Sequence, residues 1–135
     1  MKIDFIPLQV HGDDRGALIS LEREKNIPFD IRRVYYIFDT KSGVTRGFHA
    51  HRKLKQVAIV VKGSCRFILD DGTERVDVIL DNPAEGLLID SFIWREMTDF
   101  TDDCVLMVIA DMEYEESDYI RDYTEFKKIT QQQQV

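Results

Sequence analysis

Short apolar runs separated by clusters of Gly, Asp, Asn and Pro make up most of this chain, a pattern typical of an antiparallel β protein. The expected strands cover residues 2–8, 17–21, 31–38, 46–51, 54–61, 65–69, 75–80, 86–89, 92–97 and 104–110. Turns are expected at residues 11–16, 39–43, 62–64, 70–73 and 81–86, and residues 22–30 should form a loop. About ten short strands at this spacing predict an all-β fold of the antiparallel barrel or roll type.

The C-terminal part follows a different pattern. From residue 113 the charges become dense, and Tyr119, Tyr123 and Phe126 recur at helical spacing. We therefore expect a β-barrel over residues 1–112 and a short helical segment over 113–130, with turns near 117–120 and a helix near 123–129. The aromatic stripe should face the core, and residues 131–135 should form a frayed tail. The 135 residues form one domain in this interpretation.

Charge and composition exclude several classes of partner. The net charge is −7 and no basic patch is present, which argues against nucleic acid and anionic membranes, although a small anion needs only a few arginines. No apolar run approaches the length of a transmembrane helix, and the first residues lack the apolar region of a secretory signal, so we expect a cytoplasmic protein. Cys65 and Cys104 lie in apolar runs and should be buried thiols.

Two of the three histidines, His49 and His51, lie two residues apart in an expected strand. Residues i and i+2 of a strand share a face, so the two rings should project side by side while Phe48 and Ala50 face the other way. Histidine can both accept and release protons near neutral pH, and it also binds metals. The pair is therefore a metal site, an acid/base site, or a structural pair without chemistry.

The surrounding spacing resembles a known motif. Gly43, His49, His51, Gln56 and Gly63 follow the first cupin motif, which implies a cupin-type antiparallel β-barrel with the histidines inside. Gln56 stands where a cupin usually has a ligating Glu, and Arg95 stands where the last His ligand would be. A guanidinium cannot donate a lone pair and repels a cation, so we expect no metal and no other cofactor. The histidines are then available for acid/base work.

Further motifs extend the resemblance from about Ile3 to Phe126. Together and in order, they resemble the dTDP-4-keto-6-deoxyglucose 3,4-ketoisomerases, the WxcM-like sugar isomerase family. These motifs are Arg15-Gly16-Ala17-Leu18, Asn26-Ile27-Pro28-Phe29, Arg33-Val34-Tyr35-Tyr36-Ile37, Arg46-Gly47-Phe48-His49-Ala50-His51, Trp94-Arg95-Glu96-Met97 and Asp118-Tyr119-Ile120-Arg121.

This resemblance implies a metal-free isomerase that moves a ketone from C4 to C3 of a dTDP-linked 4-keto-6-deoxyhexose, for 3-amino-sugar biosynthesis. It also implies a homodimer with exchanged N-terminal strands. It assigns His49 as the base at C3 and His51 as the proton shuttle between the oxygens, although the sequence alone does not distinguish this order from its reverse. The C4 stereochemistry of the product stays open.

The remaining candidate residues should bind substrate. Arg15 and Arg46 occupy family motif positions, Arg95 replaces a cupin ligand, and Arg33 lies on a neighbouring strand. Each arginine could instead form a solvated salt bridge. Tyr35 shares the face of Arg33 and either binds the sugar or packs in the core. Trp94 is expected in the core, and His11 is expected to be structural or solvated.

Three other functions are possible for a cupin-type fold. A dTDP-sugar 3,5-epimerase also uses a His base, but it pairs the His with an Asp and a catalytic Tyr. A non-catalytic cupin module that binds nucleotide sugars needs the barrel but not two adjacent proton carriers. A metal-dependent cupin dioxygenase is disfavoured by Gln56 and Arg95.

Overall fold

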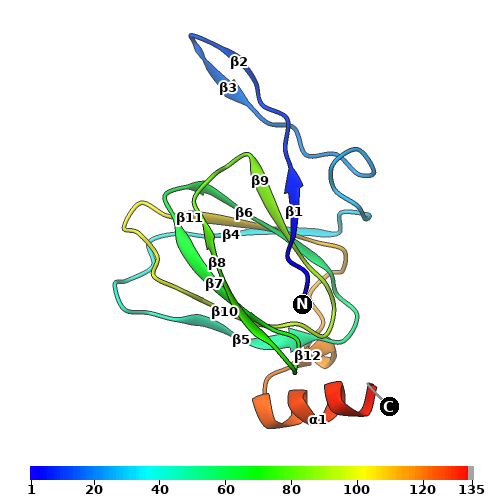
Figure 1. Ribbon diagram of the computed structural model, residues 1–135. Helices are drawn as coiled ribbons and strands as arrows, with labels where there is room; N and C mark the ends of the chain where they lie inside the picture. Colours follow the sequence, from blue (N-terminus) through cyan, green and yellow to red (C-terminus); the bar gives the residue numbers. More distant parts are fainter. Residues whose placement is uncertain (134–135) are drawn as a thin grey trace.

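The computed structural model describes residues 1–133 and places two antiparallel sheets against each other (Figure 1). The elements in chain order are β1 (Asp4–Pro7), β2 (His11–Asp13), β3 (Gly16–Leu18), β4 (Arg33–Ile37), β5 (Arg46–His51), β6 (Gln56–Lys62), β7 (Cys65–Asp70), β8 (Arg75–Leu80), β9 (Glu85–Ile89), β10 (Trp94–Thr98), β11 (Val105–Ala110), the 3-10 helix η1 (Glu116–Asp118), β12 (Tyr119–Ile120) and α1 (Tyr123–Gln133).

One sheet has the strand order β1-β9-β6-β11-β4, and the other has the order β12-β5-β10-β7-β8. The expected all-β antiparallel roll with a short C-terminal helix is confirmed. The hydrogen bonding between the described strands forms two open five-stranded sheets rather than one closed barrel, because β1, β4, β8 and β12 remain edge strands. Within residues 1–133, neither helix is long and apolar enough to cross a membrane.

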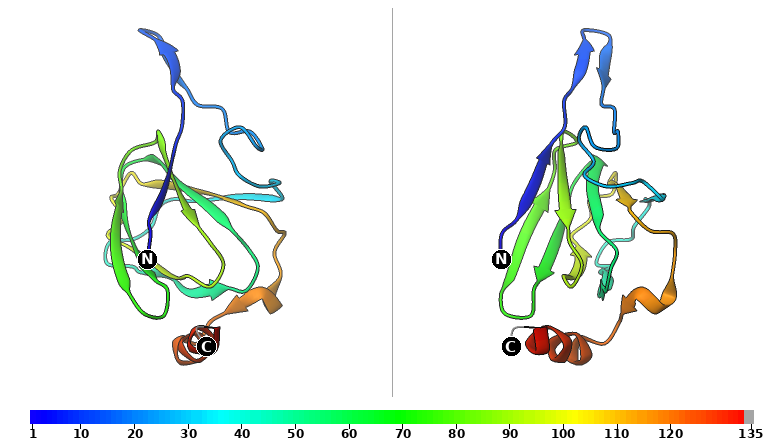
Figure 2. Two further views of the ribbon diagram at one scale, coloured as in Figure 1. Left: turned by 45° about the vertical axis from the view of Figure 1, so that its right-hand side comes forward. Right: turned by 90° about the vertical axis from the view of Figure 1, so that its right-hand side faces the viewer.

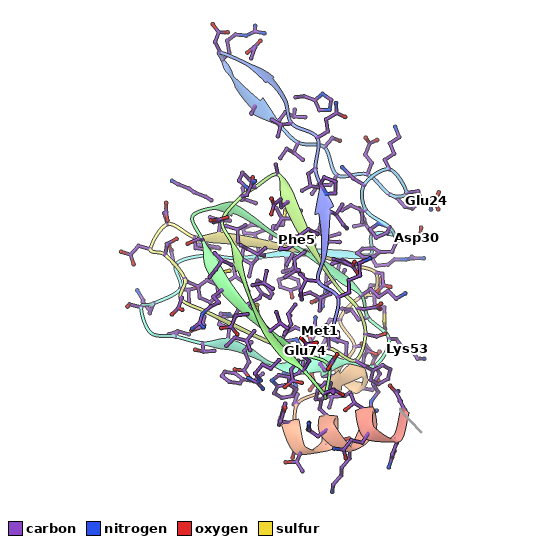
Figure 3. All side chains as sticks on the ribbon, in the orientation of Figure 1. Met1, Phe5, Glu24, Asp30, Lys53 and Glu74 are labelled. Atoms are coloured by element: carbon purple, nitrogen blue, oxygen red, sulfur yellow. The ribbon has the colours of Figure 1, made fainter. Side chains whose placement is uncertain are left out.

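The main core lies between the two sheets, and alternating side chains from both fill it. Each sheet contributes buried apolar residues from several strands, including Ala58, Val60, Leu106 and Val108 from one and Cys65, Phe67, Leu69 and Met97 from the other. Cys65 and Cys104 are buried free thiols, as expected. The chain start closes one end of the core, where the Met1 amino group donates to the Glu74 carboxylate (Figure 3).

The N-terminal region differs from the expectation that residues 11–16 form a turn. β2 and β3 form a hairpin in which His11 pairs with Leu18, so only Asp14 and Arg15 remain as the turn. The Asp13 carboxylate accepts the backbone N–H of Arg15 at 2.9 Å, which stabilises this tight connection. The hairpin projects from the body at the end opposite α1 (Figures 1 and 2), whereas β1 pairs with β9 of the same chain.

The C-terminal segment is partly helical, as expected, but Tyr119 and Ile120 are extended. They pair with His51 and Ala50 of β5, because this pairing buries Ile120 against Ala50 and Phe126. The tail expected from residue 131 is wrong for residues 131–133, which continue α1, and residues 134–135 lie outside the described part. Gly72 lets the helix approach closely, since a Cβ there would lie 2.2 Å from the Thr130 hydroxyl.

Candidate active site

The two histidines lie on β5, and their ring centroids are 5.0 Å apart, on one face as the alternation predicts. Ala50 packs on the opposite side in a separate core cluster. A β-bulge precedes the pair, because His49 faces Arg95 and Gly47 faces Glu96, which leaves Phe48 as an extra residue. The bulge brings the Gly47 carbonyl within 3.1 Å of His49 Nδ1, so Nδ1 donates its proton there and Nε2 carries the lone pair.

Gly47 is required for this bulge. Its φ is +95°, a conformation that favours glycine, and a Cβ at this position would lie 2.8 Å from the carbonyl oxygen of Arg95. The glycine of the Arg46-Gly47-Phe48-His49 motif therefore fixes the ring position of His49 through its own backbone.

His49 lines a cavity of about 530 Å³ between the two sheets. Its wall combines cationic, aromatic and apolar side chains from β4, β5, β10 and the C-terminal segment: Arg33, Tyr35, Ile37, Arg46, Gly47, Phe48, His49, Met97, Tyr119 and Arg121. The alternation predicted for β4 is observed, because Arg33, Tyr35 and Ile37 face the cavity while Tyr36 is exposed. His51 is fully buried behind this wall.

Arg95 is a buried cation next to the histidines and is only 1% exposed. Its Nη1 donates to Gln56 Oε1 and its Nη2 donates to the Ile93 carbonyl, while Gln56 Nε2 donates to the Tyr35 hydroxyl at 3.2 Å. Burial lowers the pKa of Arg95 to about 10, so the guanidinium is charged at neutral pH. Within residues 1–133 its buried Nε has no hydrogen-bond partner, so the guanidinium retains one unsatisfied donor.

Both imidazoles are neutral at pH 7. Burial, with the positive charge of Arg95 as the second cause, lowers the pKa of His49 to about 4. The same two causes lower the pKa of His51. The Asp118 carboxylate, 3.1 Å from His51 Nδ1, opposes them by favouring the protonated form.

Three residues of this site were not identified from the sequence: Asp118, Tyr119 and Arg121. The Tyr119 ring centroid lies 4.4 Å from that of His51 and 5.0 Å from that of His49. Tyr119 lines the cavity, so the expectation that this aromatic faces the core is wrong. Arg121 stacks on Tyr119, with its guanidinium carbon 4.1 Å from the ring centroid, and pairs with both Glu116 oxygens at 2.7 and 2.9 Å. The family motif Asp118-Tyr119-Ile120-Arg121 was the feature of the sequence that could have identified them.

Among the predicted site residues, the structure brings together all except Arg15. Arg33, Tyr35 and Arg46 line the cavity, and Arg95 lies behind His49. The Arg15 side chain is 87% exposed at the hairpin tip, where it pairs with Asp13 at 2.6 Å. Within one chain it therefore lies outside the cavity. Trp94 is buried with Phe126, in the core as expected.

The residues at the cupin ligand positions do not fit a metal. Arg95 donates to Gln56, so a guanidinium and an amide occupy these positions instead of carboxylate and imidazole ligands. Over the described part of the chain, no group of three or more His, Cys, Asp and Glu side chains is arranged to hold a metal ion.

Comparisons with known proteins cover nearly the whole chain. Residues 1–131 match the family model described as FdtA: WxcM-like, C-terminal. A TDP-4-oxo-6-deoxy-alpha-D-glucose-3,4-oxoisomerase from Aneurinibacillus thermoaerophilus is 57% identical over 116 residues, which are 86% of this chain and 84% of that protein.

The fold is also similar to solved structures of QdtA, a sugar 3,4-ketoisomerase from Thermoanaerobacterium thermosaccharolyticum. Its complex with TDP is 40% identical, has a TM-score of 0.95, and matches over 98% of this chain and 97% of that chain. A mutant of the same protein, with asparagine in place of a histidine, was solved in complex with TDP-4-keto-6-deoxyglucose. It is 40% identical, with a TM-score of 0.94 over 96% of this chain and 94% of that chain.

Proposed function

The chain belongs to the FdtA family of WxcM-like proteins, and we propose that it is a sugar 3,4-ketoisomerase acting on a TDP-linked 4-keto-6-deoxyhexose. The observation that carries this function is the pair of neutral imidazoles, His49 and His51, beside the buried cation Arg95. A neutral imidazole can take a proton from the carbon next to a ketone, and a fixed cation stabilises the negative charge that develops.

His49 is the carbon base in this mechanism, because it lines the cavity and its Nε2 is unprotonated. It removes the proton from C3, and the electron pair of that C–H bond becomes the C3–C4 double bond of an enediolate. The ketone oxygen at C4 then gains a proton and the hydroxyl oxygen at C3 loses one. Protonation of C4 leaves the ketone at C3, so the reaction is balanced without any external oxidant or reductant.

His51 is the group that we assign to the proton transfer between the two oxygens. Its Nε2 has no partner among the described residues, so it is free to accept a proton. Because His51 lies behind His49 and Tyr119, this role requires those rings to move apart when the substrate binds.

The nucleotide part of the substrate is an anion, and the cavity wall carries three guanidinium groups, those of Arg33, Arg46 and Arg121. Arginines bind pyrophosphate oxygens with paired, charge-assisted hydrogen bonds. Arg121 is already oriented by Glu116, and the buried Nε of Arg33 has no partner within residues 1–133. Tyr35, next to Arg33, supplies a hydroxyl for the sugar.

A homodimer with exchanged N-terminal strands is part of this proposal. The β2–β3 hairpin extends away from its own subunit and exposes Val10 and Leu18, which a second subunit would cover. An apolar groove of about 350 Å³ lies at the base of the hairpin, between Leu18 and Met107. In such a dimer, Arg15 would reach the cavity of the partner subunit.

We place this reaction in the cytoplasm. The buried cysteines Cys65 and Cys104 are free thiols, which agrees with a reducing compartment.

The test is to incubate the purified protein with TDP-4-keto-6-deoxyglucose in D2O, with and without chelator, and to follow the sugar protons by NMR. A 3-keto product, formed equally with chelator and with altered C3 and C4 signals, supports the proposal. Binding without any chemical change would instead indicate a nucleotide-sugar-binding module.

A 3,5-epimerase is the second candidate, because Asp118 and Tyr119 both contact His51. It predicts deuterium at C3 and C5 without migration of the ketone.

A further inference from the structure

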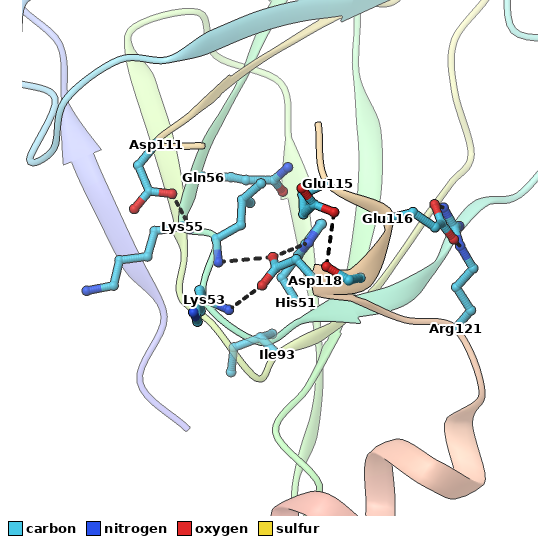
Figure 4. A network of polar contacts seen from close by, with 12 residues as sticks. His51, Lys53, Lys55, Gln56, Ile93, Asp111, Glu115, Glu116, Asp118 and Arg121 are labelled. Carbon is cyan, nitrogen blue, oxygen red and sulfur yellow. Dashed lines mark hydrogen bonds and ion pairs between the residues drawn. The ribbon is translucent and has the colours of Figure 1, made fainter. Parts of the chain in front are cut away.

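We propose that Asp118 is a positioning residue that holds His51 in the tautomer with its proton on Nδ1, so that Nε2 carries the lone pair. This inference rests on the proposed function for its catalytic consequence, but the tautomer itself can be measured independently. Figure 4 shows the contacts that carry it.

The Asp118 carboxylate accepts three hydrogen bonds although it is almost fully buried. Oδ1 accepts the backbone N–H of Lys53 at 2.8 Å, and Oδ2 accepts that of Leu54 at 3.2 Å. Oδ2 also lies 3.1 Å from His51 Nδ1. An ionised carboxylate can only accept, so the proton of this last hydrogen bond belongs to the imidazole. A neutral His51 then has no proton on Nε2.

Asp118 is itself held rigidly. Its own carbonyl accepts the backbone N–H of Arg52 at 2.9 Å, and the next residue, Tyr119, pairs with His51 in the sheet. The carboxylate therefore cannot follow the ring if it rotates or flips. The His51 ring is therefore held at Nδ1 by a carboxylate that is itself fixed.

The carboxylate also matters once the proton has been transferred. When Nε2 accepts a proton, His51 becomes an imidazolium close to Arg95, and repulsion between these cations disfavours that state. The negative charge of Asp118 against Nδ1 offsets this repulsion. Asp118 thus favours both the neutral tautomer that accepts a proton and the cation that results.

The chain offers a matched control in Asp111. Its Oδ1 accepts the backbone N–H of Lys55 at 2.9 Å, so it caps the same connecting segment, but it does not contact a histidine (Figure 4). If Asp118 were only a structural cap, Asp118→Asn and Asp111→Asn would have similar effects. Only the first substitution places a donor amide within reach of His51 Nδ1.

The experiment combines ¹⁵N NMR of the histidine side chains with kinetics on the full chain. In the wild type we expect His51 protonated at Nδ1 and bare at Nε2. In Asp118→Asn we expect the proton to shift towards Nε2 and kcat to fall roughly 100-fold or more, with KM changed less than about threefold. Asp111→Asn should retain kcat within about twofold, because no catalytic tautomer depends on it.

A wild-type His51 protonated at Nε2 would overturn the inference, even if Asp118→Asn did not fold. So would a folded Asp118→Asn variant with wild-type kcat. If the wild type had the expected tautomer but no ketoisomerase activity, the proposed function would fail. The tautomer shift in Asp118→Asn would still decide the positioning role.

Discussion

Protonation of His49 should weaken the fold as the pH falls, and the size of this effect follows from its surroundings. The pKa of His49 is about 4 in the folded protein, compared with an ordinary value of 6.5, mainly because burial disfavours the charged ring. Below pH 6.5 the unfolded chain therefore binds a proton that the folded chain does not bind until about pH 4. The contribution of neutral His49 to the unfolding free energy is fully present above pH 6.5. It is lost as the pH falls from 6.5 through 4, and it changes no further well below pH 4.

The gap of about 2.5 pH units corresponds to a total loss of about 3.5 kcal/mol, at roughly 1.4 kcal/mol per unit, of which about 3 kcal/mol is reached by pH 4. Carboxylates and His51 also titrate over this range. The useful quantity is therefore the difference in unfolding free energy between the wild type and His49→Gln, which retains the polar side chain but cannot be protonated.

Urea unfolding from about pH 7.5 to about pH 4 should show this difference declining by about 3 kcal/mol as the pH falls. An NMR titration of the His49 ring protons should have its midpoint near pH 4. The argument that burial and Arg95 keep the His49 ring neutral would be refuted by an NMR midpoint near pH 6.5. It would also be refuted if the difference in unfolding free energy between the wild type and His49→Gln changed by less than about 0.5 kcal/mol across this pH range.

Three further predictions concern the reaction. His49→Asn should abolish turnover but bind the nucleotide sugar almost as well as the wild type by calorimetry; wild-type rates would end its assignment as base. Arg95→Met should lower kcat by roughly 100-fold or more and raise the pKa of His49 in an NMR titration. An unchanged kcat and midpoint would contradict the role of Arg95. Arg15→Ala should have a lower ketoisomerase activity than the wild type. When Arg15→Ala and His49→Asn are refolded together in equal amounts, about half of the dimers are mixed and each mixed dimer has one complete site, so about a quarter of the wild-type activity should return. No recovery would count against the exchanged hairpin.

The sequence was sufficient to predict the body of the fold and the central histidine pair. Strand alternation is a local property, so it placed His49 and His51 on one face and Arg33 with Tyr35 on another. The bulge was harder to predict from the sequence, because only the pairing of Gly47 with Glu96 reveals Phe48 as the extra residue.

The residues that contact the histidines from the C-terminal segment could not be predicted in the same way. Asp118 and Tyr119 lie in a segment whose charge and aromatic spacing indicated helix, and only pairing with β5 makes Tyr119 and Ile120 extended. The contact between Asp118 and His51 spans 67 positions, and no local pattern encodes it. Arg15 illustrates the opposite case, since its motif indicated a site residue but its hairpin leads away from the cavity of its own chain.

The late position of β12 also affects how the enzyme is made. A nascent chain that has left the ribosome only as far as β11 already contains both imidazoles and every other strand of the two sheets. It still lacks the carboxylate behind one ring and the tyrosine that covers both. Under the proposed mechanism, such a chain would lack both the group that orients His51 and the side chain that shields the two rings from water, so the site would be complete only after β12 has been made and has paired with β5.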